Sequence, residues 1–285
     1  MRKITPLWIL ILILAALACQ LPGRGTSTPT STTSTEETLF DGITYIRDVR
    51  TTPRPLVIHV VQIDLRKEGI SLFVTPGDTE GELPYNARTT STFLDEFNVQ
   101  LAINGDGFTP WSNNPLSPYP KPGNPVNPLG LTISDGITYS EPRDNLPTLY
   151  ITPNGKASLN DPPTNIAYAI SGLDLIVQGG NVVADPTDST EPRTSLGLNR
   201  SGKILTLLLV DGRQPGYSEG VTLVELAGLL LEYGVFEGMN MDGGGSTTLV
   251  IEDKNGAPLV LNSPIDSNVP GRERPVANHL GVYVK

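Results

Sequence analysis

The stretch that decides the fold reads EGMNMDGGGSTTLV and spans residues 237–250. Its first half alternates methionine with the polar residues Asn240 and Asp242, a period of two that is typical of a β-strand. Three glycines then end the strand, and because glycine has no Cβ, another group can approach this backbone closely. The pattern predicts a strand that delivers an amide and a carboxylate to a glycine bend.

This bend favours a site for an anion. Free main-chain N–H groups and hydroxyl groups follow Asp242 directly, and together they can surround a negative group beside an acid or base. The residues concerned are Gly243, Gly244, Gly245, Ser246 and Thr247. The plain alternative is a tight glycine turn in a hairpin. A Walker loop is excluded because no lysine follows the glycines.

The segment before this stretch supplies a second strand and a helix. Residues 206–210 form a continuous apolar run, which ends in Asp211 and, two residues later, Arg213. A capping box at Thr222 and leucines at helical spacing predict a helix over about 223–233. Both predicted strands therefore deliver an aspartate at their carboxyl ends.

The rest of the chain contains many short strand-like runs and few helical ones. We therefore expect an α+β fold with mixed, largely antiparallel sheets and with the helix at 223–233 packed on the main sheet. The β-branched run at 56–65 is expected to pair with 70–75. Residues 110–128 carry seven prolines and are expected to form a long loop over a binding site.

Four segments together resemble the phosphodiester glycosidase family over roughly residues 55–285. The longest, TSLGLNRSGKILTLLLVDGRQPGYSEGVTLVELAGLLLEYGVFEGMNMDGGGSTTLV, spans 194–250. The others are LAINGDGFTP at 101–110, Gly130-Leu131 with Ile133-Ser134-Asp135-Gly136, and RPVANHLGVYV at 274–284. The sequence departs from the family pattern at Asp106, where the family more often has glycine, and at Thr109, beside the place of a second phenylalanine.

The resemblance implies a hydrolase that removes a sugar from a sugar-1-phosphodiester. We expect Asp242 to act at the anomeric carbon as nucleophile or base, and Asp211 to hold water or orient Arg213. Because a guanidinium group matches phosphate oxygens as a fork, Arg193 and Arg213 are expected to clamp the phosphate. The remaining expected substrate-binding residues are Thr194, Asn104, Asn240 and the bend residues 243–247.

The N-terminus has the pattern of a secretory signal. Arg2 and Lys3 precede an apolar run over 7–17, and a lone cysteine follows Ala18. We expect residues 1–18 to be a signal peptide, Cys19 to carry a lipid, 19–38 to be a flexible Ser/Thr/Pro linker, and 39–285 to be the domain. Cleavage by an ordinary signal peptidase after Ala18 is the alternative, and a membrane span is disfavoured because it needs about 20 apolar residues.

Charge and composition limit the partners. When Arg2 and Lys3 leave with the signal, the 20 Lys and Arg fall to 18 against 30 Asp and Glu, a net charge of −12. Such an acidic surface argues against nucleic acid as a partner. We expect an extracytoplasmic lipoprotein, anchored to a membrane through its N-terminal lipid, that is a monomer, uses no cofactor and binds a carbohydrate phosphodiester.

Two other functions fit the same residues. One is a cell-surface glycan-binding module that has the pocket but no turnover. The other is a metal-dependent phosphodiester hydrolase with Ca²⁺ or Mg²⁺ held by Asp106, Asp211, Asp242 and Asn240. Zinc is disfavoured because the sequence has no histidine-rich motif.

Overall fold

A computed structural model describes residues 32–78, 81–114, 116–186 and 189–285. The expected signal peptide, Cys19 and linker residues 19–31 lie outside the described residues. Within the described ranges, no helix is long and apolar enough to cross a membrane.

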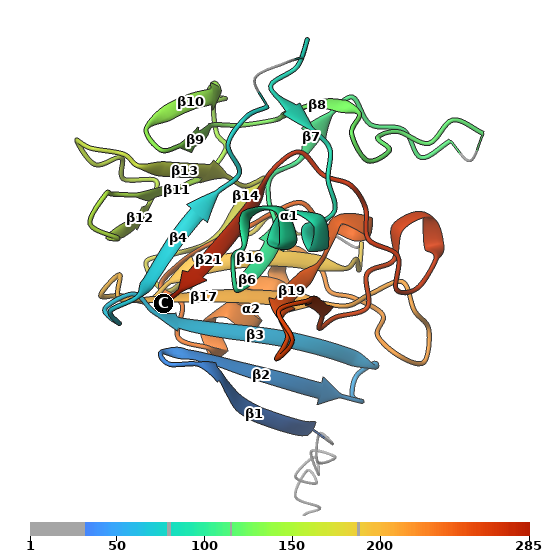
Figure 1. The fold of residues 1–285 in the computed structure, drawn as a ribbon. Helices are drawn as coiled ribbons and strands as arrows, with labels where there is room; N and C mark the ends of the chain where they lie inside the picture. The colour runs from blue at the N-terminus through green and yellow to red at the C-terminus, as the bar shows by residue number, and fades with distance from the viewer. Residues whose placement is uncertain (1–31, 79–80, 115, 187–188) are drawn as a thin grey trace, which may run out of the picture.

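An eight-stranded sheet forms the centre of the molecule (Figure 1). Each of its neighbouring pairs is antiparallel. In spatial order its strands are β1 (Thr32–Phe40), β2 (Ile43–Arg50), β3 (Leu56–Asp64), β17 (Ile204–Val210), β16 (Arg193–Leu198), β18 (Glu237–Asn240), β14 (Asp174–Gln178) and β15 (Asn181–Val182).

Three smaller sheets surround the central one. The first contains β20 (Pro258–Val260), β19 (Leu249–Glu252), β6 (Leu101–Asn104), β21 (His279–Val284) and β4 (Ile70–Val74). The second contains β10 (Ile137–Ser140), β9 (Thr132–Ser134), β13 (Tyr168–Ser171), β11 (Thr148–Ile151) and β12 (Ala157–Leu159). The third contains β5 (Tyr85–Asn86), β8 (Pro125–Pro128) and β7 (Phe108–Thr109).

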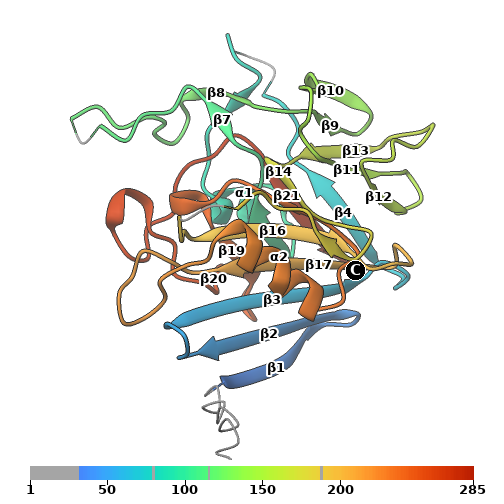
Figure 2. The same cartoon turned by 180° about the vertical axis from the view of Figure 1, so that it is seen from behind.

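Strand β17 is apolar throughout because both of its faces are buried. Leu207 and Leu209 point into a core shared with β4, β6, β19 and β21, whereas Leu208 and Val210 point to the opposite side. Helix α2 (Leu223–Glu232) covers that opposite side, as Figure 2 shows. Helix α1 (Thr90–Phe97) packs on the outer face of the β6 sheet. The order of layers is therefore helix, sheet, sheet, helix.

The expected helix and fold class are confirmed. Thr222 caps α2, and its hydroxyl and the Glu225 carboxylate form the two hydrogen bonds of a capping box. Leu226, Ala227 and Leu230 are buried against the central sheet. The structure is α+β with largely antiparallel sheets and few helices, as the sequence predicted.

Other sequence expectations are corrected. Strand β4 pairs with β21 rather than with β3, because β3 lies between β2 and β17 in the central sheet. Part of the expected linker is a strand, since residues 32–38 belong to β1 and pair with β2. The proline-rich loop also contains a strand, β8, and a bridge between Ser112 and Tyr119.

The order of three strands decides where the site lies. β16 lies between β17 and β18 and is antiparallel to both, so β17 and β18 run in the same direction. Their carboxyl ends therefore reach the same edge of the sheet, as the two aspartates in the sequence suggested. Strand β6 of the neighbouring sheet ends beside them, because the N–H of Asp242 donates to the carbonyl of Gly105 at 3.1 Å.

Candidate active site

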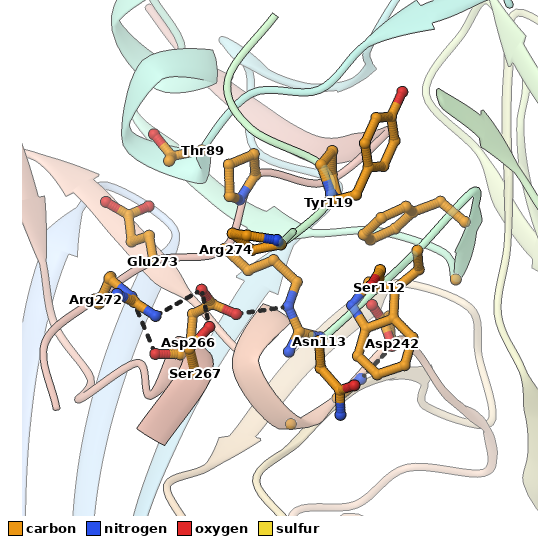
Figure 3. A pocket seen from close by; sticks show the side chains of 18 of the residues that line it. Thr89, Ser112, Asn113, Tyr119, Asp242, Asp266, Ser267, Arg272, Glu273 and Arg274 are labelled. Atoms are coloured by element: carbon orange, nitrogen blue, oxygen red, sulfur yellow. Dashed lines mark hydrogen bonds and ion pairs between the residues drawn. The ribbon is translucent and has the colours of Figure 1, made fainter. Parts of the chain in front are cut away.

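A cavity of about 1040 Å³ opens at this edge. Its walls come from the glycine bend, the loop after β17, the proline-rich segment after β7 and the loop before β21. Figure 3 shows Arg274 between Asp266 and Asp242. Six of the expected site residues line the cavity: Arg193, Arg213, Asn240, Asp242, Gly243 and Gly244.

Asp242 keeps part of its surface open to the cavity. One carboxylate oxygen accepts the N–H of Gly243 at 2.9 Å, and the other accepts the hydroxyl of Ser246 at 2.5 Å. Burial raises the pKa of Asp242, while the Ser246 hydrogen bond and the charge of Arg274 act in the opposite direction. The carboxylate is therefore held in place by neutral donors while it stays accessible to a substrate.

Two glycines of the bend lie against an arginine, and the first lies against main chain. A Cβ on Gly243 would lie 2.7 Å from the carbonyl oxygen of Pro192, with Cδ of Arg193 at 3.8 Å. A Cβ on Gly244 would lie 3.0 Å from Nη2 of Arg213, and one on Gly245 would lie 2.5 Å from Nη2 of Arg274. Guanidinium groups therefore approach the backbone at Gly244 and Gly245, and Arg193 joins these two arginines in the lining of the cavity beside Asp242.

Arg193 lacks the carboxylate partner that the other two arginines have. It is half-buried, and its guanidinium donates to the carbonyls of Val221 and Ser189 at 3.2 and 3.3 Å. Burial lowers its pKa, and the charges of Glu191 and Asp174 oppose that shift. Among the described residues no ion pair joins it to an acid, so its charge is available to an anion in the cavity.

Arg213 and Arg274 are each held by an acid. Nε of Arg213 is 2.5 Å from Glu191, and Nε of Arg274 is 2.9 Å from Asp266. Arg213 adopts a left-handed backbone with φ of 58°, which is uncommon for a residue with a side chain. Such conformations occur more often at functional sites than elsewhere, because the surrounding structure must hold them.

Arg274 links the bend to the proline-rich segment. Its Nη1 donates to the Ser246 hydroxyl at 3.3 Å, and that hydroxyl donates to Asp242. On its other side the guanidinium lies 5.4 Å from the centre of the Trp111 ring, which is half-exposed. A cation–π contact of this kind places an aromatic surface beside the charged corner of the cavity.

Asn104 and Thr194 hold the bend from behind and do not line the cavity. The Asn104 amide donates to the carbonyl of Asp242 at 2.7 Å, and its oxygen accepts the hydroxyl of Thr194 at 2.8 Å and the N–H of Thr248 at 3.2 Å. One buried side chain therefore fixes β6, β16 and both ends of the bend. The structure places these two residues as supports, whereas the sequence suggested direct substrate contacts.

The last three bend residues also lie behind the cavity wall. Gly245 packs beneath Arg274, and Ser246 is a buried partner of Asp242. Thr247 is buried as well, and its carbonyl accepts the amide of Asn262 at 3.0 Å. Gly245, Ser246 and Thr247 therefore support residues of the cavity wall and do not form the wall themselves.

The expected pairing of Asp211 with Arg213 is wrong. Asp211 is buried and does not line the cavity; its carboxylate accepts from Tyr217, Asn262 and the main chain of Ser263, and lies 3.1 Å from His59. Burial would raise its pKa, but the bond from His59 and those from Ser263 and Asn262 outweigh burial, so the pKa is lowered. Asp211 lies apart from Asp242 because β16 lies between β17 and β18 and separates these two strands by two strand spacings, roughly 10 Å.

Asn240 faces the apolar side of the cavity. Its Nδ2 donates to Asp174 at 3.0 Å, while its buried oxygen has no hydrogen-bond partner within the part of the chain that the structure describes. Phe108, Leu129 and Leu173 line the wall nearby. An apolar wall of this kind suits the face of a sugar ring.

Sequence reasoning did not assign six charged residues of the cavity to the site: Lys121, Glu191, Asp266, Arg272, Glu273 and Arg274. They lie outside the bend, in the segments around 121, 191 and 266–274, and the fold brings these segments together. Arg274 comes just before the final strand, and no spacing in the sequence connects it with Asp242. The one sequence feature connected with Arg274 is the run of glycines, because Gly245 leaves the space that its guanidinium occupies.

The residues of the metal-site alternative are not brought together. Asp211 bonds to His59 outside the cavity, and Asp106 accepts the main-chain N–H of Gly130. In the described ranges, no group of three or more His, Cys, Asp or Glu side chains is arranged to hold a metal ion.

A model of the phosphodiester glycosidase family matches residues 97–283, which include the whole bend and the cavity residues from Gly107 to Pro275. The chain belongs to the phosphodiester glycosidase family. A search of curated proteins gave no match.

Solved structures share the fold of this chain at low sequence identity. The zebrafish N-acetylglucosamine-1-phosphodiester alpha-N-acetylglucosaminidase catalytic domain, auto-inhibited by its pro-peptide, is 20% identical with a TM-score of 0.56, over 92% of this chain and 86% of that one. A hypothetical protein from Synechocystis is 16% identical with a TM-score of 0.61, over 92% of this chain and 65% of that one. A Burkholderia pseudomallei protein described as exported is 14% identical with a TM-score of 0.64, over 93% and 100%.

Proposed function

We propose that this phosphodiester glycosidase hydrolyses a sugar-1-phosphodiester and releases the sugar. The observation that carries the proposal is that three arginines, Arg193, Arg213 and Arg274, line one cavity with the accessible carboxylate of Asp242. A phosphodiester and a sugar joined at C1 need these two functions side by side: cations for the anion and a carboxylate for the anomeric carbon.

In the proposed reaction the bond between C1 and the phosphate oxygen breaks, and its electron pair leaves with the phosphate. Asp242 either attacks C1 itself or removes a proton from the water that attacks. Water supplies the hydroxyl group of the released sugar. Because a phosphate monoester is a fair leaving group, the arginines rather than a general acid stabilise the charge that develops on it.

Arg193 is proposed as the main phosphate ligand because it forms no ion pair with any acid among the described residues, and Arg213 and Arg274 add to the positive field. Phe108, Leu129 and Leu173 would contact the sugar. Asp211 and Asn104 are assigned to holding the loops, from their hydrogen bonds.

The test of the proposed function is sugar release from a panel of sugar-1-phosphodiesters by the wild-type protein and by Asp242→Asn. We expect turnover by the wild type and a loss of kcat of at least about 100-fold in the variant, the usual size for a group that acts directly on the reacting atoms. Asp253→Asn, which changes a carboxylate in the turn after β19, away from the cavity, is the matched control. Full turnover by a folded Asp242→Asn protein would refute the role of Asp242; binding without release by the wild type would indicate a glycan-binding module.

We also propose that the protein works outside the cytoplasm as a lipoprotein monomer. The support is the basic N-terminus, the apolar run over 7–17 and the single cysteine at position 19. A Cys19→Ser variant should appear in the soluble fraction while the wild type stays with the membrane. Equal membrane association of both proteins would argue against a lipid on Cys19.

A further inference from the structure

Asp106 is a buried carboxyl group that the proposed reaction does not use. It follows β6 by two residues and is fully buried. Its Oδ2 accepts the N–H of Gly130 at 2.6 Å, while its Oδ1 has no hydrogen-bond partner in the described part of the chain. A buried acceptor without a donor is costly when it is charged, so the second oxygen is the natural place for a proton.

The main chain on either side of Asp106 reaches the cavity. The carbonyl of Gly105 accepts the N–H of Asp242 at 3.1 Å. The carbonyl of Gly107 accepts the N–H of Leu129 at 2.8 Å, and a Cβ on Gly107 would lie 2.8 Å from the Leu129 side chain. Asp106 therefore lies directly behind the apolar wall and next to the strand exit that positions Asp242.

Two charged groups act on this carboxyl from the elements packed around it. Asp242 acts from the loop after β18 and Arg143 from the loop between β10 and β11, whereas the Gly130 turn and Asn278 present neutral groups. The pKa of Asp106 is raised to about 8, chiefly by burial and further by the negative charge of Asp242. The N–H groups of Gly130 and Gly107 and the positive charge of Arg143 act in the opposite direction. Near neutral pH the carboxyl thus holds its proton.

We propose that Asp106 is a proton-dependent positioning residue of this site: with its proton it supports the wall at Leu129 and Gly130, and without it a second negative charge behind Asp242 repels the anionic substrate. The inference builds on the proposed function, because it concerns the binding of an anion to that cavity. Its consequence is weaker substrate binding in alkaline solution, although the arginines keep their charge throughout this range.

The test compares KM and kcat from pH 6 to pH 9.5 for the wild type and Asp106→Asn, an amide of the same shape that cannot lose a proton. We expect KM of the wild type to rise on the order of tenfold across pH 8, the size of a charge repulsion over several ångströms near a protein surface. In Asp106→Asn KM should stay flat. Asp48→Asn, which changes a buried carboxyl on β2 that bonds to Arg50 and Tyr233, is the control and should follow the wild type.

A second readout needs no substrate. Because the folded protein holds the Asp106 proton more tightly than the unfolded chain does, this group favours folding below its ordinary pKa near 4 and loses that contribution as the pH rises to about 8. Asp106→Asn should therefore raise Tm relative to the wild type by more at pH 8 than at pH 4. If the amide variant does not fold, Asp106→Gly offers the same comparison without a side chain.

The outcomes separate the inference from the proposed function. An alkaline rise of KM that persists in Asp106→Asn, or a difference in Tm that does not depend on pH, would overturn the inference. If the wild type turns over no phosphodiester at any pH, the proposed function fails, and the Tm comparison still decides whether Asp106 holds a proton.

Discussion

At the scale of single residues, the absence of side chains in the bend is as important as the presence of Asp242. Gly245 leaves the space that Arg274 occupies, because a Cβ there would meet its guanidinium at 2.5 Å and the main chain of Asp266 at 3.0 Å. Arg274 in turn supports Ser246, the donor to Asp242. A single methyl group at Gly245 should therefore disturb a cation and the carboxylate together.

Gly245→Ala is predicted to lower kcat/KM on a sugar-1-phosphodiester by about 10-fold or more, since displacements of about 1 Å at a site often have a larger effect than this. Gly228→Ala is the control, because a Cβ at this position of α2 meets no other atom within 4 Å. That control should keep its activity and gain roughly 0.5–1 kcal/mol in stability, as alanine replaces glycine inside a helix. Unchanged kinetics in Gly245→Ala would show that Arg274 does not need its present position.

Sequence reasoning pointed to Asp242, Arg193 and Arg213, which line the cavity, because they stand next to a strand end or a glycine run. It misjudged Asp211, which has the same local pattern. The difference between the two aspartates comes from β16, which separates them, and from His59, which lies in a strand more than a hundred residues away along the chain. Such contacts between distant segments have no signature in local sequence.

At the scale of elements, the unit from β17 through α2 to β18 sets the geometry of the cavity edge. α2 buries its leucines on the face of the sheet opposite the β6 sheet, and its N-terminal cap fixes where the loop from β17 ends. The capping box was readable from the sequence because both of its partners are local. The pairing of β4 with β21 was not readable, because the two strands are separated by almost the whole domain.

Thr222→Ala is predicted to lower the free energy of unfolding by about 1 kcal/mol, the usual value of an N-cap hydroxyl. In a domain of this size the change corresponds to a fall in Tm of roughly 2–4 °C. Thermal unfolding followed by circular dichroism measures the effect, with Thr222→Ser as the control that keeps the hydroxyl. Equal Tm values for the alanine and serine variants would contradict the importance of the cap.

At the scale of the whole molecule, two sheets that pack face to face both end at one cavity, and each supplies a part that the other lacks. The central sheet brings Arg193 and Asp242, while β6 and the loop before β21 bring Asn104 and Arg274. Composition and strand patterns were enough to predict an α+β fold with antiparallel sheets. Which sheets face each other depends on the packing of the core between them, and this is why the third arginine was found only in the structure.

The division of labour between the arginines and Asp242 is the central claim. It is tested most directly by measuring kcat/KM on two substrates with the same sugar, one with a phosphodiester at C1 and one with a neutral aryl group. We predict that Arg193→Ala loses about 100-fold or more on the phosphodiester, as a charge-assisted ligand of an anion would, and little on the aryl glycoside, whereas Asp242→Asn loses activity on both. Equal losses of Arg193→Ala on the two substrates would contradict the claim.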